Sequence, residues 1–126
     1  MNERFDPLPQ PFLNIQKATK ASGFNMASDL AACNLLRTLA GTKPGGAFLE
    51  LGTGTGLSTA WILDGMDEDS TLTSIDFDED VLAIARENLG KDKRLFLELI
   101  DGEKWVNTNR EKRFDYIFAD TWHGKY

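Results

Sequence analysis

Cysteine and long apolar runs are nearly missing from this sequence, and each scarcity excludes a class of protein. The single cysteine, Cys33, leaves no partner for an internal disulfide. Its setting in "LAACNLL" is typical of a small buried side chain rather than a nucleophile. No apolar run approaches the roughly 18 residues of a membrane span, and the polar start "MNERFDPLPQP" lacks the apolar part of a signal peptide. These absences predict no membrane partner and a cytoplasmic location.

Positive charge is also in short supply. The 126 residues include 14 Lys and Arg against 20 Asp and Glu, which gives a net charge of −6. The basic residues are scattered among acids, whereas nucleic-acid binding needs a concentrated basic face. We therefore expect no nucleic-acid partner. The length suits one domain, and a hydrophobic fraction of 41% is ordinary for a globular protein.

After an N-terminal lead-in, strand-like and helix-like segments alternate. Residues 1–24 are expected to form a lead-in or lid, because Pro7, Pro9 and Pro11 disfavour helix in the residue before each of them. The domain proper is expected at 25–126. Helices are predicted at 27–41, 57–65, 78–90 and within 101–112, and strands at 47–51, 71–76, 94–100 and 114–120. This alternation predicts an α/β fold, a Rossmann-like doubly wound parallel sheet of order 3-2-1-4 with helices on both faces.

The chain ends six residues after the fourth predicted strand. A doubly wound sheet usually continues with more strands on that side, so the sequence predicts a sheet truncated after strand four. That strand would be an edge carrying Phe114, Tyr116, Ile117 and Phe118. Exposed apolar edges invite pairing with another chain, which makes a homodimer one expected outcome.

The stretch "LELGTGTGLSTAWIL" places Gly52, Gly54 and Gly56 between a predicted strand and a predicted helix. Such glycines permit positive φ and let a ligand approach amide groups at the helix N-terminus. The dinucleotide fingerprint is G-x-G-x-x-G, but here the third glycine comes one residue early and Leu57 stands where that fingerprint has glycine. The spacing therefore disfavours an NAD-dependent oxidoreductase, and a purely structural turn stays an alternative.

Acidic residues lie at the ends of the predicted strands. Asp76 ends the second strand and could accept two hydrogen bonds from a ribose diol, since Asp78 is the more natural N-cap of the next helix. Asp101 follows the third strand in "LIDG". Glu50 lies in a strand that should be buried, and because an unpartnered buried carboxylate is costly, we expect it near the ligand or bonded to glycine-loop amides. The glycine-rich turn, Asp76 and Asp101, at the ends of three successive strands, predict an adenosine-type ligand.

These segments resemble the class I S-adenosylmethionine-dependent methyltransferases. "LELGTGTG" is similar to the first motif of that family, "LTSIDFDEDVLAIARENL" to the second and "LIDG" to the third. "FADTWHGKY" is similar to the end of strand four in the catechol-type, small-molecule O-methyltransferases. The resemblance implies methyl transfer from S-adenosylmethionine to an oxygen of a small molecule. The alternative is a catalytically incomplete fragment that binds the cofactor.

The resemblance also implies roles for individual residues. Asp76 would bind the ribose hydroxyls, Asp120 would be a catalytic residue and a ligand of Mg²⁺, and His123 falls where the catechol enzymes carry a catalytic lysine. Histidine has a pKa that suits a base at neutral pH. The further Mg²⁺ ligands of that subfamily come from a later strand, which this sequence lacks, and Mg²⁺ needs several oxygen ligands. The implied cofactor contacts are Glu50, Gly52, Thr53, Gly54, Gly56, Ser58, Asp76, Phe77, Asp101, Gly102, Asp120 and Trp122.

Overall fold

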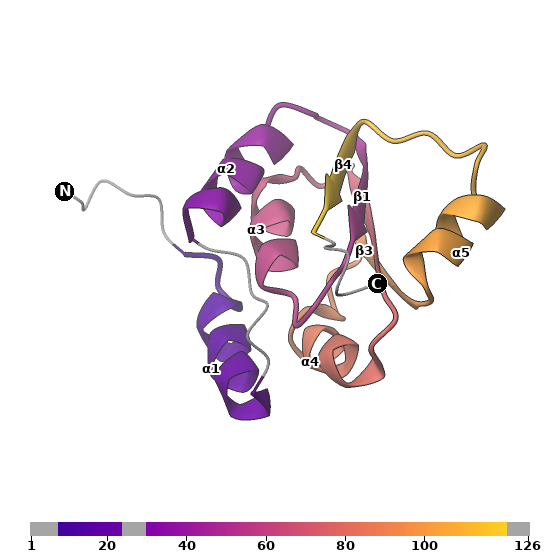
Figure 1. Ribbon diagram of the computed structural model, residues 1–126. Coiled ribbons are helices and arrows are strands. Elements are labelled where there is room, and N and C mark those ends of the chain that lie inside the picture. The colour runs from indigo at the N-terminus through magenta and orange to yellow at the C-terminus, as the bar shows by residue number, and fades with distance from the viewer. Residues whose placement is uncertain (1–7, 24–29, 121–126) are drawn as a thin grey trace.

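The computed structural model describes residues 8–23 and 30–120, which form a four-stranded parallel sheet with helices on both faces (Figure 1). The strand order is β3-β2-β1-β4, as predicted. The elements in chain order are α1 (Phe12–Ser22), α2 (Leu30–Ala40), β1 (Ala47–Leu51), α3 (Leu57–Gly65), β2 (Thr71–Asp76), α4 (Glu79–Leu89), β3 (Leu95–Leu99), α5 (Gly102–Thr108) and β4 (Tyr116–Ala119). The predicted bounds of β1 and β2 are confirmed, and β3 and β4 are shorter at both ends than predicted.

The two faces of the sheet are covered unequally. In Figure 1, α1, α2 and α3 lie on one side of the sheet and α5 on the other. Phe48 and Leu72, which are register partners, belong to the large core cluster on the α1–α3 side. Leu49 and Ile75 point to the opposite face, where they meet Trp105 of α5 in a smaller cluster. The alternation of side chains along each strand therefore builds one large and one small core.

Helix α1 lies inside the segment for which the sequence suggested only a lead-in or lid. Its Phe12, Ile15 and Thr19 are buried, and the helix contacts α3 and α4. The ring of Phe12 meets Trp61 of α3 edge-on, with 5.6 Å between ring centroids. Gly23 ends the helix at φ +80°. This part of the segment is consequently packed into the same core as the sheet.

Helix α2 buries one side chain that carries a charge. The buried side chains of this helix are those of Cys33, Leu36, Arg37 and Ala40. Arg37 donates to the Asp64 carboxylate of α3 at 2.9 Å, and its guanidinium lies 4.4 Å from the centre of the Trp61 ring. A buried cation needs such partners.

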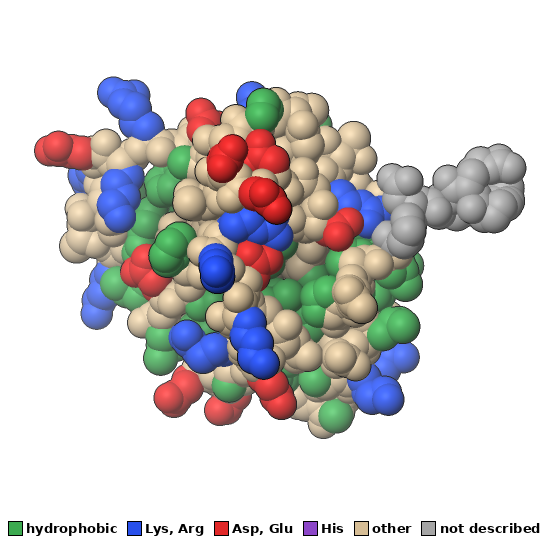
Figure 2. All heavy atoms as spheres, turned by 180° about the vertical axis from the view of Figure 1, so that it is seen from behind, with side chains coloured by type: hydrophobic (Ala, Val, Ile, Leu, Met, Phe, Trp, Pro, Cys, Tyr) green, Lys and Arg blue, Asp and Glu red, His purple; other side chains and the backbone are tan. Residues whose placement is uncertain are grey.

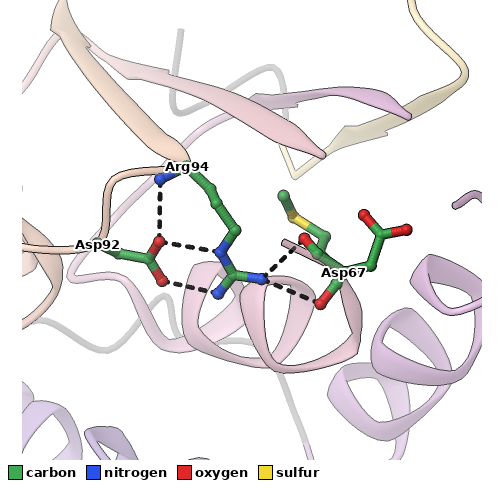
Figure 3. A network of polar contacts seen from close by, with 4 residues as sticks. Asp67, Asp92 and Arg94 are labelled. Carbon is green, nitrogen blue, oxygen red and sulfur yellow. Dashed lines mark hydrogen bonds and ion pairs between the residues drawn. The ribbon is translucent and has the colours of Figure 1, made fainter. Parts of the chain in front are cut away.

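A polar network fixes the loops at the amino ends of the strands (Figure 3). The guanidinium of Arg94 donates to both carboxylate oxygens of Asp92, at 3.0 and 2.7 Å, and to the carbonyl oxygen of Met66 at 3.0 Å. Arg94 thereby lowers the pKa of Asp92, chiefly by hydrogen bonding. The Asp67 carboxylate accepts from the Ser70 hydroxyl and from a backbone amide in the loop before β1. The α3–β2 loop is in this way joined to the start of β3.

The fourth strand has the apolar composition that the sequence predicted. Tyr116 and Phe118 are half-buried against the large core, whereas Ile117 points to the other face and is 61% exposed.

Figure 2 shows a surface from behind, on which acidic, basic and hydrophobic side chains are interspersed. Within residues 8–23 and 30–120, no helix combines the length and the apolar character needed to cross a membrane.

Candidate functional site

The glycine-rich turn forms a tight loop between β1 and α3. Gly52, Gly54 and Gly56 all have positive φ, at +104°, +58° and +99°. The amide of Gly52 donates to the carbonyl of Ile75 at 2.8 Å, which ties the loop to the end of β2. A Cβ at Gly56 would lie 3.0 Å from a methyl carbon of Leu89 in α4. Both the backbone conformation and the close helix therefore require glycine at this position.

Asp76, at the end of β2, holds this loop directly. Its buried carboxylate accepts from the Gly54 amide at 2.8 Å and from the Asp78 amide at 2.9 Å. Asp78 caps α4, as predicted, by accepting from the amides of Asp80 and Val81. The expectation that Asp76 would be left free for a ligand is thus only half right, because each oxygen already accepts one amide. A carboxylate has about four acceptor positions, so these two amides leave two of them unused.

Glu50 is fully buried in β1 and accepts three hydroxyl protons. Ser58 and Thr59, in the first turn of α3, donate at 2.5 Å each, and Ser74 of β2 donates at 2.6 Å. Burial raises the pKa of Glu50 from 4.5 to about 7, against the three hydroxyl hydrogen bonds, and the negative charge of Asp120 adds to the rise. Of the two places expected for Glu50, bonding to the loop amides is wrong, since its donors are side-chain hydroxyls, and a place near the ligand stays a prediction.

The sequence assigned these partners to none of the four hydroxyls in this network, which belong to Thr53, Ser58, Thr59 and Ser74. The Thr53 and Ser74 oxygens lie 2.7 Å apart, and because Ser74 gives its one proton to Glu50, Thr53 donates to Ser74. Thr59 and Ser74 were not among the predicted site residues. A usable indication was present, because Glu50 and Ser74 are register partners in a parallel β1–β2 pair and a buried acid requires donors on its neighbours.

The other predicted residues lie at the same edge of the sheet. Asp101 caps α5, accepting from the amide of Lys104 at 3.1 Å, and Gly102 begins that helix beside open space. Phe77 follows β2 and is 48% exposed. Asp120 follows β4, is half-buried, and donates its amide to the Leu51 carbonyl at 2.9 Å. The structure therefore brings the ends of all four strands, with their predicted residues, to one edge.

The metal prediction finds little support in the donor set. Among the described residues, no three His, Cys, Asp or Glu side chains gather as metal ligands. Asp120 has Glu50 as an acidic neighbour, but the oxygens of Glu50 are engaged by hydroxyls. Mg²⁺ prefers six oxygen ligands, and the described residues alone do not supply them. Trp122 and His123, the remaining predicted site residues, lie outside the described residues.

A glycine loop and buried acids at the carboxyl edge of a parallel sheet define a Rossmann-like domain of the kind that binds a nucleotide cofactor. The comparison with known families makes the class specific. The methyltransferase domain model matches residues 48–124, and the chain belongs to this family. The resemblance noted from "LELGTGTG" and the later motifs is confirmed at the level of the family.

Individual relatives agree with this assignment. A Mycobacterium leprae protein with the name "Putative O-methyltransferase" is 32% identical over 94 residues, which are 71% of this chain and 41% of that protein. A relative from Mycobacterium avium of the same name is 42% identical over 57 residues, 45% of this chain and 24% of the relative. The chain thus spans less than half the length of these curated relatives.

Solved structures share the fold. The O-methyltransferase from Bacillus cereus, in complex with SAH, superposes with a TM-score of 0.77 at 21% identity, over 91% of this chain and 56% of that one. The O-methyltransferase TomG from Streptomyces achromogenes, in complex with SAM, gives a TM-score of 0.78 at 21% identity, over 89% and 53%. Both comparisons confirm the Rossmann-like fold and the strand order.

Proposed function

We propose that this chain binds S-adenosylmethionine at the carboxyl edge of the sheet and transfers its methyl group to an oxygen of a small molecule. One observation carries the proposal. Two buried carboxyl groups, Glu50 and Asp76, flank the glycine loop, and every hydrogen bond that they accept comes from a neutral hydroxyl or amide. A cationic ligand would balance these groups, and the sulfonium and ammonium groups of this cofactor are cations. The bound SAH and SAM of the two structural neighbours support the same ligand class.

The cofactor would lie along the ends of β1, β2 and β3. We place the methionine part and the ribose against the loop from Gly52 to Gly56, with the amino group toward Glu50. The two open acceptor positions of Asp76 suit the two ribose hydroxyls. Phe77, exposed at the end of β2, would pack on the adenine, and Asp101 would face its amino group. The further proposed cofactor contacts are Thr53, Ser58, Gly102, Asp120 and Trp122.

The chemistry divides between the ligand and the chain. The sulfonium of the bound donor supplies an electrophilic methyl group. The chain must hold the acceptor oxygen in line with that methyl group and remove its proton. We propose Asp120 and His123 for the proton, and Trp122 as a wall of the acceptor site. Since the described residues do not make a Mg²⁺ site, no step is assigned to a metal ion.

The proposed cofactor unit is residues 25–126, with residues 1–24 as the adjoining segment. We place the protein in the cytoplasm, in keeping with its single, buried Cys33. A homodimer along β4 is proposed because Ile117 is exposed on this strand. Sedimentation of the wild type and of Ile117→Lys tests the dimer, since a charged residue there should shift a dimer toward monomer.

Calorimetry with S-adenosylhomocysteine and with NAD tests the cofactor. We expect S-adenosylhomocysteine to bind and Asp76→Asn to weaken it at least tenfold, because the amide group cannot accept from both backbone donors and the ribose. Asp78→Asn is the matched control, since asparagine also caps helices well. Binding of NAD without binding of S-adenosylhomocysteine would remove the methyltransferase proposal.

A second candidate function follows from the length of the relatives. Because the chain spans 41% of the M. leprae relative, it could bind the cofactor without completing an acceptor site. Methyl transfer to catechols and other hydroxylated acceptors, with and without Mg²⁺, separates the two candidates. Turnover supports the enzyme. Tight cofactor binding with no turnover on any acceptor supports the binding fragment.

A further inference from the structure

A hydrogen bond between two threonines joins the N-terminal helix α1 to the glycine loop. Thr19, in the last two turns of α1, lies with its hydroxyl oxygen 2.7 Å from that of Thr55, between Gly54 and Gly56. Both side chains are buried. The two residues are 36 positions apart in the sequence, so this contact exists only when α1 is docked on the domain.

The direction of this bond follows from counting protons. The Thr19 hydroxyl donates its one proton to the carbonyl oxygen of Ile15, one turn earlier, at 2.6 Å. Thr19 can therefore only accept from Thr55. The hydroxyl proton of Thr55 has this acceptor as its partner, and at 2% exposure it is shielded from water. Removal of the Thr19 oxygen would leave a buried donor without an acceptor.

The other hydrogen bonds described above for the loop connect it to the sheet. The amides of Gly52 and Thr53 donate to the Ile75 carbonyl, the Gly54 amide donates to Asp76, and the Thr53 hydroxyl donates to Ser74. All of these partners belong to β2. Thr55, by contrast, connects the loop to the helical layer. Its partner helix is α1, whose Phe12 and Ile15 are buried in the large core.

We propose that Thr19 is a positioning residue, which fixes the glycine loop through Thr55 and makes cofactor affinity depend on the docking of α1. This inference rests on the proposed function, because it assigns the loop to the cofactor. It gives α1 a role that the methyltransferase motifs do not contain, since the family model begins at residue 48. Thr19 itself need not touch the ligand.

The size of the effect follows from the buried donor. Leaving a buried hydroxyl unsatisfied has a large cost, whereas replacing both partners by apolar groups of the same shape can be nearly neutral. Thr19→Val should therefore raise the dissociation constant of S-adenosylhomocysteine about tenfold. Thr19→Ser keeps the oxygen and should bind within about twofold of wild type. The double variant Thr19→Val/Thr55→Val should bind more tightly than Thr19→Val alone.

Thr38→Val is the matched control. Thr38, on α2, also donates to the carbonyl four residues earlier, at 3.1 Å, but it is exposed. This variant has the same change of side chain at an exposed helical position, where the Thr38 hydroxyl bonds within its own helix. All variants are compared by calorimetry with S-adenosylhomocysteine, by thermal melting, and by hydrogen exchange of the peptide covering residues 52–58 in the ligand-free chain.

The outcomes are separable. Faster exchange of the loop in Thr19→Val, with weaker binding and rescue by Thr19→Ser, supports the proposal. Equal loop exchange and equal binding in Thr19→Val and Thr38→Val overturn it, as does a Thr19→Val variant whose only change is a lower melting temperature. If wild type binds no S-adenosylhomocysteine but Thr19→Val still loosens the loop, the cofactor assignment fails while the mechanical link between α1 and the loop stands.

Discussion

Acidic side chains at the two edges of the sheet have different kinds of partner. At the amino edge, Asp92 is half-buried and faces the guanidinium of Arg94, so each charge has a counter-charge (Figure 3). At the carboxyl edge, Glu50 and Asp76 are buried, and neutral hydroxyls and amides are their hydrogen-bond donors. The first arrangement is complete without a ligand. The second leaves buried acidic groups for which a bound cation would be favourable.

This difference shows in the pKa values of the carboxyl groups. Arg94 lowers the pKa of Asp92, whereas burial raises that of Glu50 to about 7. The ion pair of Asp92 and Arg94 stabilises the fold when Asp92 is ionised. A buried acid such as Glu50 destabilises the fold when it is ionised. The stability contributed by the acids at the two edges should therefore change with pH in opposite directions and over different pH ranges. Substitutions at the two edges should also differ in their effect on ligand binding.

The largest effect is expected at Gly56. Gly56→Ala combines a left-handed backbone with a Cβ 3.0 Å from Leu89, and should lower the free energy of unfolding by about 3–4 kcal/mol. Gly45→Ala, at φ +63° with nothing within 4 Å, is the matched control and should cost about 1 kcal/mol. Urea unfolding measures both. Equal losses would show that α4 does not constrain the loop.

Glu50 is expected to make stability fall as pH rises. Between its ordinary pKa of 4.5 and about 7, the folded chain holds a proton that the unfolded chain releases, so the free energy of unfolding decreases by about 3 kcal/mol across this interval. Glu50→Gln should remove that slope. The measurement is urea unfolding of both proteins at pH 5 and pH 8. A slope that is unchanged in Glu50→Gln would contradict the assignment.

Arg94→Ala should destabilise the amino edge alone. Loss of its bonds to Asp92 and to the Met66 carbonyl should lower the free energy of unfolding by about 1–2 kcal/mol at pH 7, since the pair is partly exposed. Because Arg94 holds the pKa of Asp92 below 3.8, the ionic part of this stabilisation is present above that pH and lost as pH falls further. The affinity for S-adenosylhomocysteine should not change, and a change would mean that the two edges are coupled.

The smallest effect on stability is expected at Phe77. It is 48% exposed, so Phe77→Ala should change the free energy of unfolding by no more than about 0.5 kcal/mol, yet weaken S-adenosylhomocysteine binding several-fold. Phe96, 52% exposed on β3, provides the matched control. Phe96→Ala should have a similar stability and unchanged binding. Equal binding by the two variants would remove Phe77 from the proposed adenine contact.

The sheet and its strand order could be predicted because the strands are short apolar runs, and a helix-forming segment follows each of the first three. The glycine spacing and the strand-end acids likewise indicated which residues meet at one edge of the sheet, and cofactor binding at that edge stays a prediction. Helix α1 was not predicted as a helix. Of its buried residues only Phe12 and Ile15 are apolar, which is too short a stripe to indicate a helix, and the nearby prolines favoured extended chain. Its third inward residue is a threonine, which a search for an apolar stripe passes over.

The partners of the acids could not be predicted from spacing alone. The three donors of Glu50 come from α3 and from β2, and Ser74 reaches it only through the register of two parallel strands. Asp76 was expected to be free once Asp78 was recognised as a cap, but the Gly54 amide of the loop donates to one of its oxygens and the Asp78 amide, two residues on, to the other. The contacts of Glu50 with Ser74 and of Asp76 with Gly54 depend on three-dimensional placement, for which the sequence contains no local pattern.

The strand order also has a consequence for how the chain folds. β1 lies between β2 and β4, and the Ala47 amide donates to the Asp115 carboxylate, 68 residues away. A ribosome therefore releases β1 long before its second neighbour exists. Non-local pairings of this kind slow folding, so we expect β1, β2 and β3 to assemble first and the addition of β4 to be the late step. Until then β1, an inner strand of the finished sheet, is exposed as an edge.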